Sequence, residues 1–586
     1  MPPSPFSHVT PVSRRESVFR FASGAAATCL ALAGLAGGAR AQVAGAATKC
    51  QGQKVSEVQV QTKPPYYPRN GKWWTSPLGV LSSIHVNTKP QVVQRFLLLR
   101  PGMPCSAADL AESERILRAQ PFIAEAHITP YDDGTGGVIL VVQTTDEFTP
   151  ILALGTKARS PFLTSFRVGE GNFLGSGRSA SVEWANGSMR DTYGLRLTDY
   201  QFMGQPWHLN LLLQREDVGA SNWLVDMSHP YITDRQRVAW RVISEDRSEV
   251  FGFARSDLAS VPIDVDRKFT DVGGIVRIGA SKQLSLFGLS VSHEEDNIGL
   301  PPVPDTVVSY DTLLSRFPSR LNTRLNLLWG LRSISFKPVQ HFDALEAIQD
   351  VRVGFQFGAL VGRGVRALGG RDDDLYLAGD LYAGGGNDRT FGYLTATAEG
   401  RQDYALNAWD AILASVRLVM YRRLDENQTL VGTLDWGSGW RQRIPFLLRL
   451  GEVDGGVRGY VDSQDGGAMR GVARIEDRLV LGRVRDQAAV GLAFFADAGR
   501  VWAGDAPFGV TTPLKMGFGV GLLGAFPPGS QHTWRLDLAV PVNHDAHARW
   551  EVRLSVLNAN RIDNREPRDI RYSRELVAPS SVYSWP

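Results

Sequence analysis

An arginine in a glycine-rich segment and an aspartate in an alternating strand have types and a spacing that suit a buried ion pair. Arg458 lies in the segment Gly455-Gly456-Val457-Arg458-Gly459-Tyr460, and Asp497 lies in Phe495-Ala496-Asp497-Ala498-Gly499. An arginine guanidinium is planar, stays charged, and binds a carboxylate through two parallel hydrogen bonds. The pattern predicts that this pair holds a loop against a strand. The alternative is a set of solvated surface charges, which would contribute almost nothing to stability.

No arrangement of catalytic or metal-binding residues accompanies this pair in the sequence. The chain has no Gly-x-Ser-x-Gly nucleophile motif, no Gly-x-x-x-x-Gly-Lys-Ser/Thr phosphate loop, and no His/Cys pattern with zinc spacing. The run Asp372-Asp373-Asp374 is interpreted as a solvated acidic turn in preference to a Ca²⁺ site. The sequence therefore predicts a protein that is not an enzyme and that holds no metal or other cofactor.

The composition is typical of a chain rich in turns and strands. Its 586 residues include 60 glycines and 32 prolines, with 9% aromatic and 21% charged residues, which fits neither a helical bundle nor a disordered chain. Lys and Arg number 63 against 60 Asp and Glu, which leaves a formal net charge of +3. Nucleic-acid phosphates require clustered cations, so no nucleic-acid partner is expected.

Residues 1–41 are interpreted as an export signal. Arg14, Arg15 and Arg20 precede or open an apolar run of small residues, and Ala39-Arg40-Ala41 has the small-x-small pattern of a cleavage site. The mature protein is therefore expected to leave the cytoplasm.

Two cysteines, Cys50 and Cys105, remain in the mature chain after this signal is removed. Both lie in the same N-terminal region, so an oxidising compartment permits one disulfide between them. Two unpaired thiols are the alternative, because a bridge requires a Cα separation that the sequence does not give.

Residues 42–148 are predicted to form a small α+β domain in the order β-α-α-β-β. Its expected elements are a strand over 81–86, helices that open at Thr88-Lys89-Pro90 and at Ser106-Ala107-Ala108-Asp109, and strands over 124–131 and 138–145. The proline-rich segment 63–68 can continue neither a strand nor a helix and is expected to be a loop.

Residues 149–558 repeat short segments in which apolar and polar residues alternate. In 351–358, Val and Phe occupy the odd positions and Arg, Gly and Gln the even ones, and 534–540 shows a similar alternation. A transmembrane antiparallel barrel, with lipid outside and water inside, has this pattern, as does a soluble antiparallel sandwich. The export signal, the length of the region and its lack of helices favour the barrel. After residue 41 no apolar run is long enough to cross a bilayer as a helix.

Several of these segments resemble one family of outer-membrane proteins. The matching residues are Val457, Arg458, Gly459 and Tyr460 for a Val-Arg-Gly-Phe/Tyr loop, Phe495, Asp497 and Gly499 for a Phe-x-Asp-x-Gly strand, and Asn172, Gly175 and Gly177 for a periplasmic turn between early strands. The family is the BamA/TamA-like outer-membrane assembly and translocation superfamily, or bacterial surface antigen family, which includes the two-partner-secretion transporters. Segments 98–102 and 115–123 resemble its POTRA domain, which would be present once.

The resemblance implies how the barrel is built around Arg458. It implies about sixteen strands, with the Val-Arg-Gly motif in the sixth extracellular loop and five strands after it. That loop folds back into the lumen, where Arg458 is expected to meet Asp497, with Glu476 as a second partner. The chain departs from the family at its end, because a polar tail over 559–586 follows the last predicted strand, which usually closes on an aromatic residue.

The resemblance also implies a function at the outer membrane of a bacterial cell. The barrel would contact outer-membrane lipid and assist the insertion or translocation of unfolded or secreted polypeptides, with the POTRA-like domain in the periplasm. That domain would bind extended chains by adding a strand to its sheet, or serve only as a spacer. The alternative function is a passive pore or structural surface protein without polypeptide clients. The sequence does not decide whether accessory lipoproteins take part.

Overall fold

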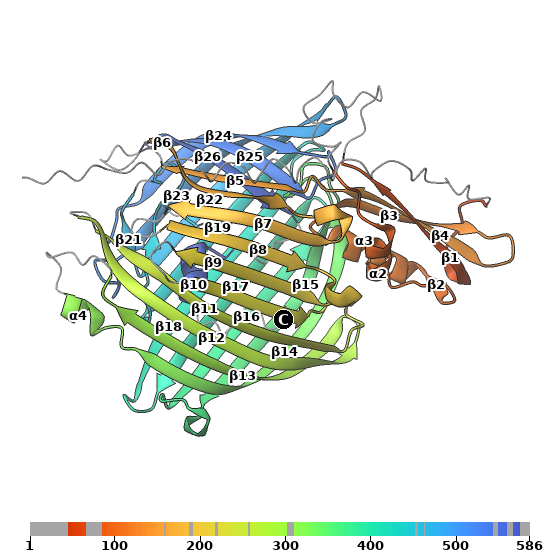
Figure 1. Cartoon of the computed structure of the whole chain (residues 1–586). Coiled ribbons are helices and arrows are strands. Elements are labelled where there is room, and N and C mark those ends of the chain that lie inside the picture. The colour runs from red at the N-terminus through yellow and green to blue at the C-terminus, as the bar shows by residue number, and fades with distance from the viewer. Residues whose placement is uncertain are drawn as a thin grey trace, which may run out of the picture. The chain divides into compact units, whose positions relative to one another are not determined.

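The computed structural model of the chain contains a small N-terminal α+β domain and a large closed barrel (Figure 1). The predicted export signal, 1–41, lies outside the described residues. The described residues are 45–65, 85–157, 160–186, 191–216, 221–255, 258–301, 310–451, 455–461, 463–542, 549–559 and 566–574. None of the helices in these ranges is long and apolar enough to cross a membrane.

The small domain is a four-stranded sheet with two helices packed on it. The sheet order is β2-β1-β4-β3, with β1 parallel to β4 and the other pairs antiparallel. Its elements are β1 (Gln51–Lys63), α2 (Pro90–Phe96), β2 (Pro104–Ser106), α3 (Ala107–Arg118), β3 (Ile123–Asp132) and β4 (Val138–Asp146). Val93, Leu117 and Phe122 are fully buried and join apolar residues of the strands in one core, which holds the helices on the sheet.

The first strand of this domain lies earlier in the chain than predicted. The predicted strand over 81–86 falls outside the described residues except for His85 and Val86, which are not in a strand. The strand that opens the domain is β1, which ends where the proline-rich segment begins. A β-bulge between Val55 and Glu57 shifts the phase of its alternation. That shift interrupts the period of two by which a strand is recognised in a sequence.

A disulfide joins Cys50 and Cys105, whose Cα atoms are 5.0 Å apart. Cys50 immediately precedes β1, and Cys105 lies in β2, which pairs with the start of β1. The bridge spans a sequence separation of 55 residues, and Cys105 is buried. It therefore fastens the edge of the sheet to the segment that leads into α3.

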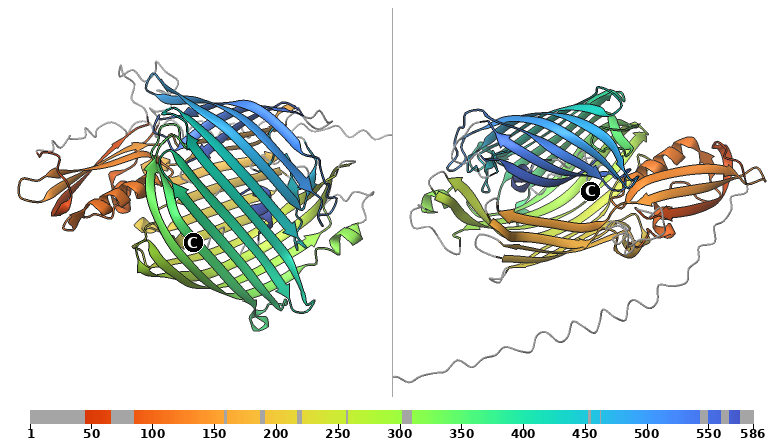
Figure 2. Two further views of the ribbon diagram at one scale, coloured as in Figure 1. Left: turned by 180° about the vertical axis from the view of Figure 1, so that it is seen from behind. Right: turned by 90° about the horizontal axis from the view of Figure 1, so that it is seen from above.

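Twenty antiparallel strands close into the barrel, and the last strand, β26, lies beside the first, β5. The strands run obliquely around the wall, which Figure 1 and Figure 2 show from opposite sides. The fifteen strands that precede Arg458 are β5 (Pro150–Lys157), β6 (Ser160–Glu170), β7 (Arg178–Asn186), β8 (Asp191–Asp199), β9 (His208–Glu216), β10 (Ser221–His229), β11 (Val238–Arg255), β12 (Leu258–Ala280), β13 (Gln283–Gly299), β14 (Arg320–Val339), β15 (Gln349–Gly364), β16 (Asp374–Gly386), β17 (Thr390–Asp403), β18 (Ala408–Arg423) and β19 (Gln428–Trp440). The five that follow it are β22 (Met469–Val484), β23 (Ala488–Trp502), β24 (Lys515–Ala525), β25 (His532–Pro541) and β26 (Glu551–Asn558).

The predicted number of about sixteen strands is wrong, because the barrel contains twenty. Five strands follow Arg458, as predicted, and all the additional strands precede it. The predicted number came from the family resemblance, whereas fifteen strands precede Arg458 in the structure. The connection that carries Arg458, 441–468, is therefore the eighth at its end of the barrel and not the sixth.

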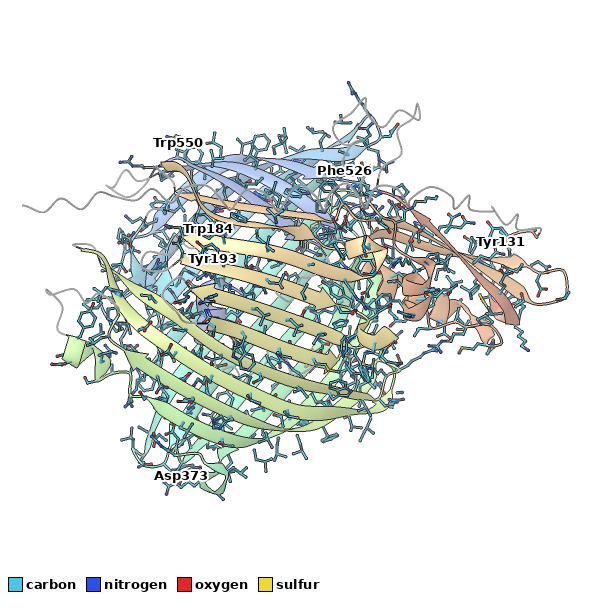
Figure 3. All side chains as sticks on the ribbon, in the orientation of Figure 1. Tyr131, Trp184, Tyr193, Asp373, Phe526 and Trp550 are labelled. Carbon is cyan, nitrogen blue, oxygen red and sulfur yellow. A yellow bond between two sulfur atoms is a disulfide. The ribbon has the colours of Figure 1, made fainter. Side chains whose placement is uncertain are left out.

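Apolar side chains cover the outside of the barrel, whereas its inside holds buried polar side chains together with clusters of apolar ones. Along β14, Leu325 and Leu327 are 47% and 58% exposed, whereas the intervening Asn326 is 0% exposed. Figure 3 locates Tyr193, which is 55% exposed, and its cross-strand neighbour Trp184 on the wall. A soluble sandwich would bury its apolar faces, so the structure excludes that alternative.

The two ends of the barrel send different segments into the lumen. β5 begins just after the small domain, so we call the end of the barrel at which β5 begins the proximal end. Connections such as 171–177 and 340–348 lie at this end. Connection 441–468 belongs to the opposite, distal end. Within 340–348, Phe342 stacks on Tyr421 of β18, with ring centroids 4.8 Å apart, and both side chains are buried. The lumen therefore receives ordered chain from both ends.

Candidate functional site in the barrel lumen

Arg458 lies inside the barrel on the connection between β19 and β22 and binds Asp497 of β23. Its Nε donates to Asp497 Oδ2 at 2.7 Å, and its Nη2 donates to Asp497 Oδ1 at 2.7 Å. The backbone N–H of Arg458 donates to the same carboxylate at 3.2 Å. The two residues that the sequence singled out therefore form a bidentate pair.

Two further carboxylates surround the same guanidinium. Arg458 Nη1 donates to Asp537 Oδ2 at 2.9 Å and lies 3.5 Å from Glu476 Oε2. Glu476 was the predicted second partner, whereas Asp537 of β25 was missed. The alternation over 534–540 contained the signal for Asp537, because apolar residues on the lipid side place the residues between them in the lumen.

This cluster is almost completely withdrawn from solvent. The side chains of Arg458, Glu476, Asp537 and Asp497 are 9%, 8%, 3% and 0% exposed. Burial lowers the pKa of Arg458, but the hydrogen bonds and charge of Asp497, with the charges of Glu476 and Asp537, outweigh burial and raise this pKa above its ordinary value. The guanidinium therefore stays charged, and loss of Arg458 would leave the buried Asp497 carboxylate without its bidentate cation.

Two more arginines neutralise the remaining negative charge. Arg535 donates through Nη1 to Glu476 Oε1 at 2.7 Å and through Nε to Asp537 Oδ1 at 2.7 Å. Arg478 donates through Nε to Glu476 and through Nη1 to Asp343 Oδ1 at 3.1 Å. Because Asp343 belongs to the connection that enters from the proximal end, the network joins the inserted segments of both ends.

The other two members of the Phe-x-Asp-x-Gly motif shape the space around Arg458. The Phe495 ring faces the guanidinium, with its centroid 3.4 Å from Arg458 Cζ, which is a cation–π contact. Gly499 leaves room for Val457, because a Cβ at Gly499 would lie 2.8 Å from Val457 Cγ2 and 2.9 Å from Gly471 O. The motif therefore supplies a charge, an aromatic face and a gap.

Gly459 and Tyr460 extend the attachment to the last strands of the barrel. The backbone N–H of Gly459 donates to Glu551 Oε2 of β26 at 2.8 Å. Tyr460 is 1% exposed, and its Oη donates to Met516 O of β24 at 3.1 Å. With the bonds of Arg458 to β23 and β25, three consecutive residues contact each of the last four strands.

Replacing Gly459 by alanine is expected to destabilise the barrel by about 1–2 kcal/mol, the cost of a left-handed backbone for an L-residue. Gly459 has φ +94°, and a Cβ there would also lie 3.1 Å from Pro541 N. Urea unfolding in detergent, followed by tryptophan fluorescence, measures the loss. Gly432→Ala is the matched control, because a Cβ at Gly432 meets no atom within 4 Å. Equal stability of the two variants would contradict this account.

The turn predicted from Asn172, Gly175 and Gly177 lies at the proximal end, between β6 and β7. Asn172 Oδ1 accepts a bond from the backbone N–H of Gly177 at 2.8 Å, and its Nδ2 donates to Thr88 Oγ1 at 2.7 Å. A Cβ at Gly175 would lie 2.1 Å from Asn87 O. These residues close a turn that packs against the segment leading into α2, and they do not contribute to the Arg458 cluster.

The acidic run 372–374 was predicted to be a solvated turn, and this prediction is wrong for Asp374. Asp374 is the first residue of β16 and is 0% exposed. It accepts bonds from Arg324 Nη2 at 3.1 Å and Asn322 Nδ2 at 3.0 Å. Asp374 is buried because the side chain at the first position of β16 points into the barrel. The sequence did not indicate this, since it did not show where β16 begins. In the described parts of the chain, no group of three His, Cys, Asp or Glu residues is placed to hold a metal ion.

No protein-family model matches the chain, and no curated protein matches its sequence. Solved structures do resemble it. The chain is similar to "BamA from Haemophilus ducreyi lacking POTRA domains 1-3" at 12% identity and a TM-score of 0.35, covering 86% of this chain and 85% of that one. It is similar to CdiB from Acinetobacter baumannii at 12% identity and a TM-score of 0.36, covering 81% of this chain and 74% of that one. It is also similar to CdiB from Escherichia coli at 12% identity and a TM-score of 0.37, covering 86% of this chain and 75% of that one. Similarity at this level decides neither fold nor function. The fold is given by the strands of the closed barrel.

Proposed function

We propose that this chain is an integral outer-membrane barrel that assists the insertion or translocation of polypeptides, without chemical turnover. In this proposal residues 1–41 are an export signal, 42–148 a periplasmic POTRA-like domain, 149–558 the membrane barrel and 559–586 a C-terminal tail. The outer wall contacts lipid, because an apolar surface of this extent is stable in hydrocarbon and not in water.

The observation that carries the proposal is the anchored connection 441–468. A passive pore needs an open lumen, whereas this barrel places a long connection inside and fixes it to four strands through residues 458–460. Such an anchor couples the shape of the wall to the position of the inserted chain. This coupling suits a barrel that must rearrange around a polypeptide better than one that stays open to solutes.

One edge of the small domain's sheet offers a place for an extended polypeptide. β1 pairs with β4 along most of its length, but among the described residues its other side pairs with β2 only at Gln51 and Lys54. Beyond Val55, no described residue pairs with the backbone N–H and C=O groups on that side, which can therefore take a further strand. We therefore place the client-binding edge at residues 57–63.

Depletion of the protein, followed by proteomics of the outer membrane, tests the proposed function. We expect one class of surface proteins to be lost. A photo-crosslinking residue at Glu57, on the open edge, should trap polypeptide clients, whereas one at Thr135, an exposed residue of the β3–β4 turn, should not. An unchanged outer-membrane proteome, together with solute flux through the barrel, would support the passive pore instead.

A further inference from the structure

Residues 566–574, which come after β26 in the chain, lie inside the barrel. The short helix α5 (Arg568–Ser573) lies in this segment and appears within the outline of the barrel from both sides (Figure 1; Figure 2, left). Tyr572 stacks on Phe251 of β11, with ring centroids 5.6 Å apart, and Asp569 binds Arg470 of β22. These two strands are nearly opposite in the ring of twenty, so the segment crosses the lumen.

The ion pair between Asp569 and Arg470 is one anchor of this segment. The guanidinium of Arg470 donates to both Asp569 oxygens, with Nη2 3.1 Å from Oδ1. The side chains of Asp569 and Arg470 are 10% and 4% exposed. A Cβ at Gly455 would lie 2.8 Å from Pro567 Cγ. The C-terminal segment is therefore packed on the same connection that Arg458 anchors.

Arg574 forms a second anchor, on β17 and β18. Its Nη1 donates to Glu399 Oε2 at 2.9 Å, and its Nη2 donates to Thr397 Oγ1 at 2.8 Å. Its Nε donates to Glu566 Oε2 at 3.2 Å, and Glu566 Oε1 accepts a bond from Ser415 Oγ at 3.1 Å. Arg574 and Glu399 are 6% and 1% exposed, so this pair is as deeply buried as the Arg458 cluster.

Apolar packing fills the space between the two anchors. Ile570 is 2% exposed and packs against Leu413, Phe446 and Leu448. Gly437 of β19 makes room for it, because a Cβ at Gly437 would lie 2.4 Å from Ile570 Cδ1. The wall therefore matches this segment in charge at both anchors and in shape between them.

We propose that residues 566–574 are a tethered plug, bound in a peptide site on the inner wall of the barrel. The site takes a short segment with an acidic residue for Arg470, an aliphatic residue for the gap at Gly437 and a basic residue for Glu399. The plug closes the lumen between opposite walls. This inference concerns the passage of ions through the barrel and goes beyond the proposed role in polypeptide insertion or translocation.

A cavity beside the plug indicates what its removal would open. Its volume is about 440 Å³, and it is lined by Glu566 and Arg571 of the plug and by wall residues that include Arg417 and Arg474. Because the plug forms one side of this cavity, its release joins the cavity to the rest of the lumen and opens a polar path along the wall.

Ion conductance of the purified protein in planar lipid bilayers tests the proposal. We expect the mature chain to conduct weakly and a variant that ends at residue 559 to conduct several-fold more. A synthetic peptide of residues 566–574, added to the truncated variant, is expected to reduce its current saturably. A scrambled peptide of the same composition is expected to have no effect.

Point variants separate the loss of the plug from a failure to fold. Gly437→Leu fills the gap for Ile570 from the wall, so it is expected to raise the conductance of the mature chain several-fold. Gly432→Leu on the same strand is the matched control, because a Cβ at Gly432 meets no atom within 4 Å. Arg470→Asp and Asp569→Arg are each expected to raise the conductance, and their combination to lower it again.

Two outcomes would overturn the proposal. One is equal conductance of the mature chain, the truncated variant and Gly437→Leu. The other is a truncated variant whose current the peptide leaves unchanged. Both measurements use ions only, so their failure leaves the proposed polypeptide function standing. An unchanged outer-membrane proteome after depletion would likewise leave the plug standing.

Discussion

Replacing Arg458 by methionine is expected to lower the free energy of unfolding of the barrel by about 3–5 kcal/mol, the cost of breaking a buried ion pair from one side. The Asp497 side chain is 0% exposed, and each of its oxygens lies 2.7 Å from a guanidinium nitrogen of Arg458. Without Arg458 this carboxylate stays buried and loses both of those bonds. Urea unfolding in detergent measures the loss, with Arg549→Ala, at an exposed position, as the matched control.

The three acidic partners of Arg458 are expected to differ in importance. Asp537 keeps a cation when Arg458 is removed, because Arg535 Nε lies 2.7 Å from both of its oxygens. Glu476 likewise keeps Arg535 and Arg478. Asp497 also accepts three hydrogen bonds from Arg458, whereas Asp537 accepts one, so Asp497→Asn is expected to destabilise the barrel more than Asp537→Asn. The reverse order would contradict the account of the cluster in which Asp497 is the main partner.

The combination of Arg458→Met with Asp497→Asn distinguishes direct pairing from two independent losses. The double variant removes both charges, so its cost is expected to be well below the sum of the single costs. Additive losses would show that the two side chains do not stabilise the barrel through each other.

Replacing Cys50 and Cys105 by serine is expected to destabilise the small domain by about 2–5 kcal/mol. The bridge closes a sequence separation of 55 residues, and a cross-link of this span restricts the unfolded chain. It also holds β2 on the edge of β1, where only two residue pairs join the strands. Limited proteolysis of the full-length protein in detergent measures the effect, and we expect cleavage within 51–146 to accelerate.

The single variants provide the control for the disulfide. Cys50→Ser and Cys105→Ser each remove the bridge, so each is expected to accelerate cleavage about as much as the double variant. The barrel strands are expected to resist the protease equally in all three. Native resistance of the small domain in the double variant would show that its core alone maintains the fold.

The barrel and the centre of the lumen were predictable because their signals are local. Alternation with a period of two decides which side chains face lipid, and it holds along β14, where Leu325 and Leu327 are exposed and Asn326 is buried. The motif residues Arg458 and Asp497 were recognisable because an arginine among glycines and an aspartate on a lumen-facing position need a partner. The first strand was missed because the bulge at Val55 breaks the same period.

Strand number and the partners of the cluster required the tertiary structure. Alternation gives the direction of each side chain but not how many strands close the ring, since closure depends on register and tilt. The contact of Asp537 with Arg458 depends on the position of β25 beside β24, and the contact of Glu551 with Gly459 depends on the position of β26 in the wall.

The sequence by itself determined a β-barrel with an apolar outer face, five strands after the Val-Arg-Gly motif and a charged pair at Arg458 and Asp497. Only the tertiary structure decided that twenty strands close the ring and that residues 566–574 of the polar tail lie in the lumen. The physical reason is that the tail is held by contacts between distant parts of the chain, such as Asp569 with Arg470 and Ile570 with the gap at Gly437. A polar segment of this composition has no period that reveals where its partners lie.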